Sequence, residues 1–207
     1  LKKQEKQGFH FYGYENDRGQ LEGYIFFQLN KEKMLVHEMM YLSNPVKEEF
    51  FRFFHLHNAQ VETVVWRAPA GDSSLLLLPE APVDCRLLKG MMARVVNVKS
   101  ALEHLSFPPE RAASFSLRVD DPLAGWHHNR CFRVRIAEGK ATVQEEPENR
   151  EEPDLFCPIQ SFSQFVLGYT GLKESVELGR VILRDEKNLR ELAELFPAKR
   201  TFMNDWF

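Results

Sequence analysis

Apolar and polar positions alternate along the first third of the chain in the way that β-strands require. Aromatic and β-branched residues fill 9–15 and 20–30, and the turn sequence Asn-Asp-Arg-Gly at 16–19 stands between these two runs. A third run at 34–42 follows four polar residues. These three segments are therefore predicted to pair as an antiparallel meander.

A helix is predicted to follow the meander. Asn44 stands where an N-cap residue belongs, Pro45 stands where a first helical residue belongs, and the phenylalanines and leucine at 50–56 supply an apolar face. The helix is expected to end near His57. Residues 61–67 are rich in β-branched side chains and are predicted to return as a strand.

A domain boundary is predicted after this strand. Prolines and a glycine interrupt the chain between 69 and 82, on either side of the apolar run at 75–78. The edge of the first domain is expected at 85–90. The chain is accordingly divided into a domain at 1–88 and a domain at 89–207.

In the second domain the predicted order is strands followed by helices. A strand at 91–97 and a short helix at 98–105 come first, and an acidic, proline-containing loop at 145–154 separates the later strands from the helices. Glu138-Gly139 is expected to close a tight hairpin. The remaining strands and helices are predicted at 115–119, 131–137, 140–145, 159–167, 173–178 and 186–195. This order predicts an α+β fold.

Composition and charge exclude several classes of function. The chain has 207 residues, of which 43% are hydrophobic and 28% charged, and its net charge of -3 gives no broad cationic field for nucleic acid. No run reaches the roughly 18 apolar residues that span a bilayer, and the first residues lead into no signal-peptide core. The protein is expected to be cytoplasmic, without a nucleic-acid or membrane partner.

The three cysteines are Cys85, Cys131 and Cys157. They are odd in number and far apart, without the paired spacing of a disulfide framework or a zinc knuckle. We expect them to be buried, reduced thiols. The sequence opens on Leu1 rather than Met, so the chain is expected to be either processed or cut from a longer protein.

Common catalytic and metal-binding motifs are incomplete. Residues 37–41 (His-Glu-Met-Met-Tyr) begin like the zinc-protease helix H-E-x-x-H, but Tyr replaces the second ligand and the segment is a predicted strand. His55 and His57 are two apart on a helix and point to different faces. His127-His128 near Asp120-Asp121 reads as a polar loop. No metal is therefore expected, and neither a nucleophile elbow nor a P-loop is present.

The junction between the third strand and the first helix bears on cofactor binding. In the GNAT acetyltransferase fold, a Q/R-x-x-G-x-G/A loop between a strand and a helix presents backbone N–H groups to the pyrophosphate of acetyl-CoA. Here only Ser43-Asn44-Pro45 joins the two elements, with no glycine and with a proline that lacks an N–H. The pattern fits a GNAT-like half-sheet without a cofactor loop.

Two sets of residues resemble one family. The segment Leu-Glu-Gly-Tyr-Ile-Phe-Phe at 21–27, followed by Leu-Val-His-Glu at 35–38, resembles the second, cofactor-free GNAT-like domain of the enhanced-intracellular-survival (Eis-like) N-acetyltransferases. Arg-Val-Val-Asn-Val at 94–98, Leu-Arg-Val-Asp-Asp-Pro at 117–122 and Phe-Arg-Val at 132–134 resemble their C-terminal sterol-carrier-like domain. The turn that holds Trp126 and Asn129 is stretched by two histidines relative to the family pattern.

The resemblance implies part of an enzyme. Family members carry a complete GNAT domain ahead of this region, which binds acetyl-CoA, so no cofactor is expected on the present chain. They end on an aromatic residue whose α-carboxylate acts as general base toward a primary amine. The corresponding residue here is Phe207, and Trp206 and Asp205 are expected to contact the substrate. From the residues alone, packing of these terminal aromatics onto the core is the favoured interpretation, and only the resemblance favours the carboxylate role.

Two other functions stay open at this point. A sterol-carrier-like module could bind an apolar ligand between sheet and helices without catalysis, with Phe162, Phe165, Val166 and Leu167 lining the tunnel, although the same side chains fit an ordinary core. A scaffold for oligomer assembly is the third alternative, because the family analogy implies homo-oligomers. The acceptor amine is not specified by the sequence.

Overall fold

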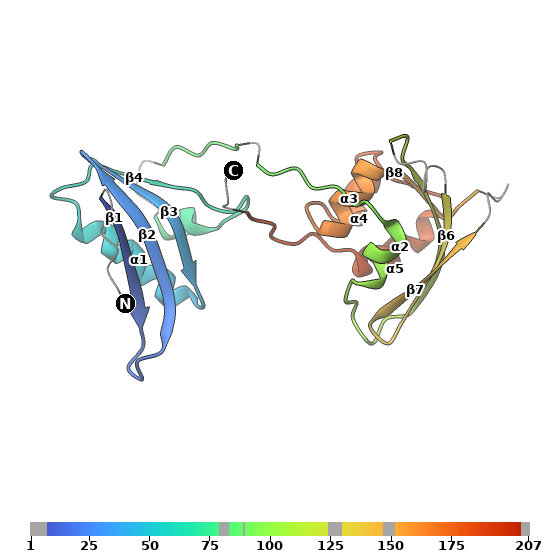
Figure 1. Cartoon of the computed structure of the whole chain (residues 1–207), viewed down its shortest axis with the longest axis horizontal. Helices are drawn as coiled ribbons and strands as arrows, with labels where there is room; N and C mark the ends of the chain where they lie inside the picture. The colour runs from blue at the N-terminus through green and yellow to red at the C-terminus, as the bar shows by residue number, and fades with distance from the viewer. Residues whose placement is uncertain (1–7, 79–82, 89, 124–129, 147–151, 204–207) are drawn as a thin grey trace. The chain divides into compact units, whose positions relative to one another are not determined.

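The structure is a computed structural model of the chain, and it describes residues 8–78, 83–88, 90–123, 130–146 and 152–203. The chain forms two compact units (Figure 1). One comprises Leu1–Leu88 and Phe202–Phe207, and the other comprises Lys89–Thr201. Both units combine strands and helices, which confirms the α+β class.

The sheet of the first unit has four strands in the order β1-β2-β3-β4. The predicted meander is confirmed, because β1 (Phe9–Glu15), β2 (Leu21–Asn30) and β3 (Lys33–Tyr41) pair antiparallel. β4 (Thr63–Trp66) lies parallel to β3. Asn16 explains the first turn, since its side-chain oxygen accepts hydrogen bonds from the backbone N–H groups of Arg18 and Gln20.

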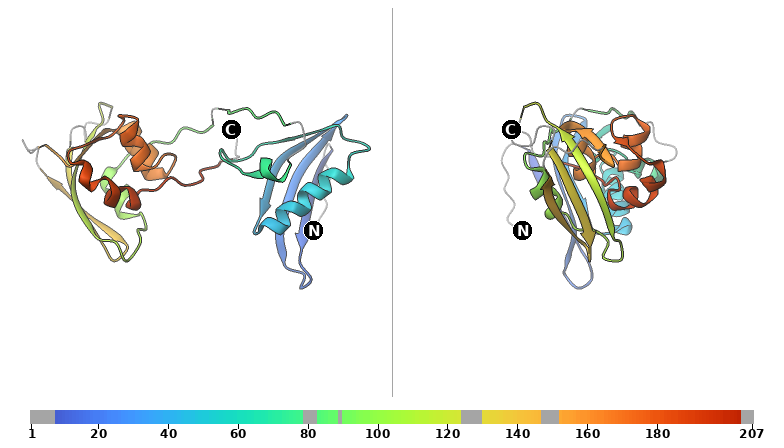
Figure 2. Two further views of the ribbon diagram at one scale, coloured as in Figure 1. Left: turned by 180° about the vertical axis from the view of Figure 1, so that it is seen from behind. Right: turned by 90° about the vertical axis from the view of Figure 1, so that its right-hand side faces the viewer.

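Helix α1 (Asn44–Leu56) crosses one face of this sheet (Figure 2). Its N-cap is Ser43, not the predicted Asn44, because Ser43 has extended dihedral angles and Asn44 already belongs to the helix. Gly23 lets the helix approach β2, since a Cβ atom there would lie 2.7 Å from Cγ1 of Val46. The core between sheet and helix contains Ile25, Phe27, Met34, Val36, Met39, Val46, Phe50 and Val61.

The second unit is built on a five-stranded sheet in the order β7-β6-β5-β8-β9. The predicted strands β5 (Ala113–Asp120), β6 (Arg130–Ala137) and β7 (Lys140–Glu146) are antiparallel. Glu138 and Gly139 close the hairpin with φ angles of 51° and 77°, as an Xaa-Gly turn of this kind requires. Two short strands were not predicted, β8 (Leu155–Pro158) and β9 (Ile182–Leu183).

Helices cover one face of the second sheet (Figure 1). They are α2 (Val98–Glu103), α3 (Ile159–Leu167), α4 (Leu172–Glu177) and α5 (Leu189–Leu195), so the single helix expected at 186–195 begins with a separate 3-10 turn at Glu186–Asn188. The inward residues of β5, β6 and β7 alternate with outward ones and form the core with these helices. The structure describes no helix long and apolar enough to cross a membrane.

The strand predicted at 91–97 is wrong for the described residues of this segment, which hold no regular element. Side chains, not a neighbouring strand, satisfy its polar groups. Val95 donates its backbone N–H to Oγ of Ser163 (3.0 Å), and Asn97 caps α2 by accepting from the N–H of Ser100. Arg94 donates to both carboxylate oxygens of Asp121 at 2.6 Å. β-Branched composition alone therefore overpredicted a strand.

Candidate functional site

The connection between β3 and α1 is two residues long, Leu42 and Ser43. Pro45 lies in the first turn of the helix and has no N–H, while Lys47 already donates its backbone N–H to the carbonyl oxygen of Ser43. The first free N–H groups of a helix are what usually hold an anion. Here the short connection leaves no glycine-rich loop to place such groups around a phosphate.

A buried polar cluster joins the end of β3 to α1. Lys47 Nζ lies 3.3 Å from each carboxylate oxygen of Asp72, and the two side chains are 4% and 7% exposed. The hydroxyl of Tyr41 donates to the same carboxylate at 3.3 Å. Ser74 donates both its N–H, at 2.7 Å, and its hydroxyl. We call Tyr41, Lys47, Asp72 and Ser74 the Asp72 cluster.

The ionised form of Asp72 is favoured by these contacts. Burial raises the pKa of Asp72, but the hydrogen bonds from Ser74 and the Lys47 ammonium outweigh burial, so the pKa lies below the ordinary value. The parallel pairing of β3 with β4 ends at Val36 and Trp66, whereas β3 continues to Tyr41. The cluster thus places a compensated ion pair, Lys47 with Asp72, beside the first turns of α1.

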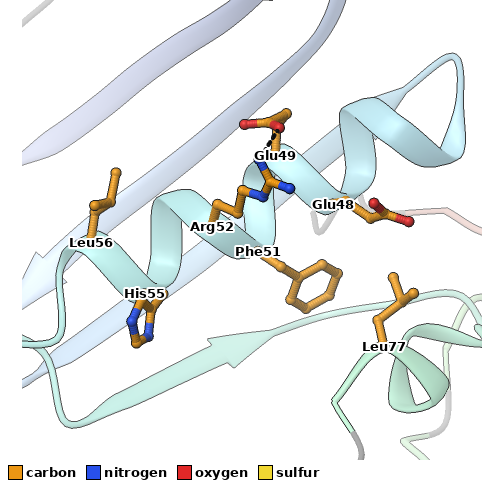
Figure 3. Close-up of a pocket in the computed structure, with 7 residues that line it drawn as sticks. All are labelled: Glu48, Glu49, Phe51, Arg52, His55, Leu56 and Leu77. Atoms are coloured by element: carbon orange, nitrogen blue, oxygen red, sulfur yellow. Dashed lines mark hydrogen bonds and ion pairs between the residues drawn. The ribbon is translucent and has the colours of Figure 1, made fainter.

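A solvent-open groove of about 630 Å³ lies on the outer side of α1, and Figure 3 shows Phe51 pointing from the helix toward Leu77. Arg52 and Glu49 form an ion pair of 3.0 Å on its rim, and both side chains are exposed. The groove is lined by Glu48, Glu49, Phe51, Arg52, His55, Leu56 and Leu77. The charged pair on its rim is thus open to solvent.

The predicted site residues Asp205, Trp206 and Phe207 lie outside the described residues, as do His127 and His128. The histidines of α1 do not act together, because His57 contacts the carbonyl oxygen of Phe53 at 2.8 Å while His55 lines the outer groove. Among the residues that the structure describes, no group of three or more His, Cys, Asp or Glu could hold a metal ion.

Two family models match the chain. The model of the sterol carrier protein domain matches residues 98–204, more than half of the chain. The chain belongs to the sterol carrier protein domain family. The model of the acetyltransferase (GNAT) domain matches residues 1–95, so the expected order of a GNAT-type and a sterol-carrier-type domain is confirmed. No curated protein matches the chain.

Several solved structures share this fold. A probable N-acyltransferase from Enterococcus faecalis V583 is 24% identical with a TM-score of 0.84, covering 96% of this chain and 50% of that one. A GCN5-related N-acetyltransferase from Anabaena variabilis is 26% identical with a TM-score of 0.81, covering 99% and 52%. Eis1 from Mycobacterium abscessus is 18% identical with a TM-score of 0.57, covering 89% and 48%. The chain spans about half the length of these structures.

The interior of the sterol carrier protein domain is packed with side chains at the positions suggested for a ligand tunnel. Phe162, Phe165 and Val166 are 0%, 2% and 5% exposed, and Leu167 points outward. The ring of Phe165 lies 5.4 Å from that of Phe162 and 5.4 Å from that of Phe196, both edge-on. These contacts make the three residues part of the core and do not favour an apolar-ligand carrier.

Sequence reasoning missed the Asp72 cluster. The local signal was present, because Gly-Asp-Ser-Ser at 71–74 is a typical turn sequence and Asp72 accepts the N–H of Ser74 two residues on. Its pairing with Lys47, 25 residues away, follows only from the packing of α1. A lysine inside an otherwise apolar helix face was the only hint of a buried partner.

Proposed function

We propose that this chain is the C-terminal half of an acetyl-CoA-dependent N-acetyltransferase of the Eis-like group, which acts on a primary amine. The observation that carries the proposal is the order of a GNAT domain match followed by a sterol carrier protein domain match. The N-acetyltransferase from Anabaena variabilis supports it, because nearly all of this chain aligns with about half of that protein.

In this proposal acetyl-CoA binds to a further GNAT domain of the same protein and not to the first unit of this chain. Two features support this division. The β3–α1 connection has two residues and is followed by Pro45, so it offers few backbone N–H groups. The ammonium of Lys47 is also held by Asp72 at 3.3 Å, so this cation is not available to a phosphate.

The proposed general base is the α-carboxylate of Phe207, with Trp206 and Asp205 beside the substrate. The amine nitrogen bonds to the acetyl carbonyl carbon of acetyl-CoA, the C–S bond breaks and CoA leaves as the thiolate, and the carboxylate takes the proton that the amine loses. A free α-carboxyl group titrates at about 3.3–3.7, which makes it a weak base in water. Apolar surroundings would raise this pKa, and Trp206 and Phe207 could provide them.

The catalytic role of the terminal carboxylate is tested by changing its position in the full-length protein. Adding a few residues after Phe207, or deleting Phe207, should cut kcat severely while calorimetric affinity for acetyl-CoA stays unchanged. Phe207→Leu is the matched control, because it keeps the carboxylate and should cost much less. Unchanged turnover in the extended variant would show that the carboxylate is not the base.

The proposal that acetyl-CoA binds to a further GNAT domain is tested on the 207-residue chain by itself. Calorimetric titration with acetyl-CoA should give no measurable heat of binding. Micromolar affinity for this chain would contradict the proposal that the cofactor is held elsewhere. Asp72→Asn in the same titration separates the two reasons given above, since it releases the Lys47 cation from its ion pair without lengthening the β3–α1 connection.

A further inference from the structure

The first sheet has two faces, and within the first unit α1 covers one of them. The register places Ile25 and Phe27 of β2 and Val36 of β3 on the face that packs against α1. The alternate positions point to the other face. Beside Gln28, which pairs with Phe9 and Leu35, they include Phe9, Phe11, Tyr24, Phe26, Leu35, His37, Glu38, Met40 and Val65, which we call the aromatic face.

Two groups of rings pack on the aromatic face. Phe9 stacks on Phe26 with centroids 5.4 Å apart, and Phe11 stacks on Tyr24 at 5.2 Å. His37 lies in the β-bulge of β3 and contacts Phe9 and Phe26, each at 5.5 Å. Phe11, Met40 and Val65 are nevertheless 46%, 51% and 45% exposed. An apolar surface of this kind marks an interaction site.

The second sheet shows what a water-facing surface looks like in this same chain. Its uncovered positions pair Ser114 with Arg135 and Ser116 with Arg133, and β7 adds Thr142 and Gln144. Polar and charged residues thus alternate with the core positions, as expected for a sheet with one wet face. The aromatic face of the first sheet departs from this pattern, so it is adapted to contact with other protein.

The polar groups on the aromatic face are arranged for burial. Tyr24 donates its hydroxyl hydrogen to Glu38 at 2.6 Å, so the phenol and the carboxylate satisfy each other within the face. Buried polar groups cost much less free energy when they are hydrogen-bonded. This hydrogen bond offsets part of the cost of covering the Glu38 carboxylate, and a cationic group of the partner would offset the rest.

We propose that the aromatic face is the docking surface for the upstream half of the same polypeptide, an inference that rests on the proposed function. Similar solved structures are about twice as long as this chain, which covers 50% and 52% of two of them. The sequence enters the sheet through β1, and Phe9 and Phe11 of that strand belong to the face. Because consecutive elements usually lie side by side, the upstream segment is well placed to cover it.

Hydroxyl-radical footprinting of the full-length protein and of the 207-residue chain tests the inference. Modification of Phe11 and Met40 should fall severalfold in the full-length protein. Tyr12 is the matched control, because it belongs to the same strand, is 49% exposed and lies on the opposite face of the sheet. Tyr169 of the second unit is a second control, and both tyrosines should keep their reactivity.

A charge placed on the face gives an independent readout. Phe11→Glu should lower the Tm of the full-length protein, because it would bury a carboxylate, and should change the Tm of the 207-residue chain little. Gln144→Glu adds the same charge to the exposed side of β7 and should leave both proteins unchanged.

Three results would overturn the proposal. Equal modification of Phe11 in both proteins would mean that the face stays open. Protection that appears in the 207-residue chain and rises with its concentration would assign the face to a second copy. A native polypeptide that starts at residue 1 would leave no upstream half. Acetyl transfer by the full-length protein is assayed in parallel. If the protein is active but Phe11 is not protected, the proposed function stands and the docking surface is rejected. If Phe11 is protected but the protein is inactive, the docking surface stands and the proposed function is rejected.

Discussion

Lys47 and Asp72 form an ion pair of 3.3 Å in which neither side chain is more than 7% exposed. Removing one partner of a buried pair leaves the other charge uncompensated, which typically costs about 3–5 kcal/mol. Asp72→Ala should therefore strongly lower the free energy of unfolding of the first unit, as measured by urea denaturation. Glu49→Ala breaks the exposed pair with Arg52 and should cost less than about 1 kcal/mol. Equal effects of the two substitutions would contradict the buried character of the pair.

The same pair predicts a dependence of stability on pH. The folded pKa of Asp72 is lower than that of an unfolded aspartate, near about 3.9, so the unfolded state takes up the proton first. The stabilisation by Asp72 is then fully present above this unfolded value and is lost as pH falls through the folded pKa. The difference in unfolding free energy between the wild type and Asp72→Asn should be constant near neutral pH and shrink below about pH 4. A difference that grows as the pH falls would contradict the prediction that the folded pKa of Asp72 lies below its unfolded value.

Gly23 predicts a steric effect at the contact between β2 and α1. A Cβ atom there would lie 2.7 Å from Cγ1 of Val46 and 2.8 Å from the carbonyl oxygen of Met40. Gly23→Ala should destabilise the protein by about 1–3 kcal/mol, the usual cost of overpacking. Gly90→Ala is the control, because no atom lies within 4 Å of a Cβ built at Gly90. Thermal unfolding of both variants gives the comparison.

The cysteines should differ sharply in reactivity. The expectation that all three are buried is wrong for Cys85, which is exposed, whereas Cys131 and Cys157 are buried, and burial raises the pKa of the Cys157 thiol to about 12. Because the thiolate is the reactive form, an aromatic disulfide reagent should modify one thiol rapidly in the native protein and two more only on unfolding. Cys85→Ser should abolish the rapid phase. Rapid modification of two thiols would show that one core opens readily.

Most regular elements could be predicted because their patterns are local. The strands from Phe9 to Tyr41 alternate clearly, and Glu138-Gly139 carries its own turn signal. β8 was missed because its four residues are too few to show a period, and its parallel pairing with β5 depends on residues about 38 positions away. The segment from Arg94 to Asn97 was misjudged because side chains of distant residues, Asp121 and Ser163, decide its conformation.

The candidate site was predictable only in part. The short junction at Ser43 and Pro45 is visible in the sequence, since it depends on neighbouring residues. The ion pair of Lys47 with Asp72 is not, because it forms only after α1 has packed across the sheet. The role of Phe207 rests on family resemblance and stays a prediction.

The two-residue connection between β3 and α1 also limits how this domain can evolve. A point mutation can exchange Pro45 or Asp72, but it cannot add backbone, and a loop that encircles a phosphate needs several more residues. Such a loop would require an insertion in the connection between β3 and α1.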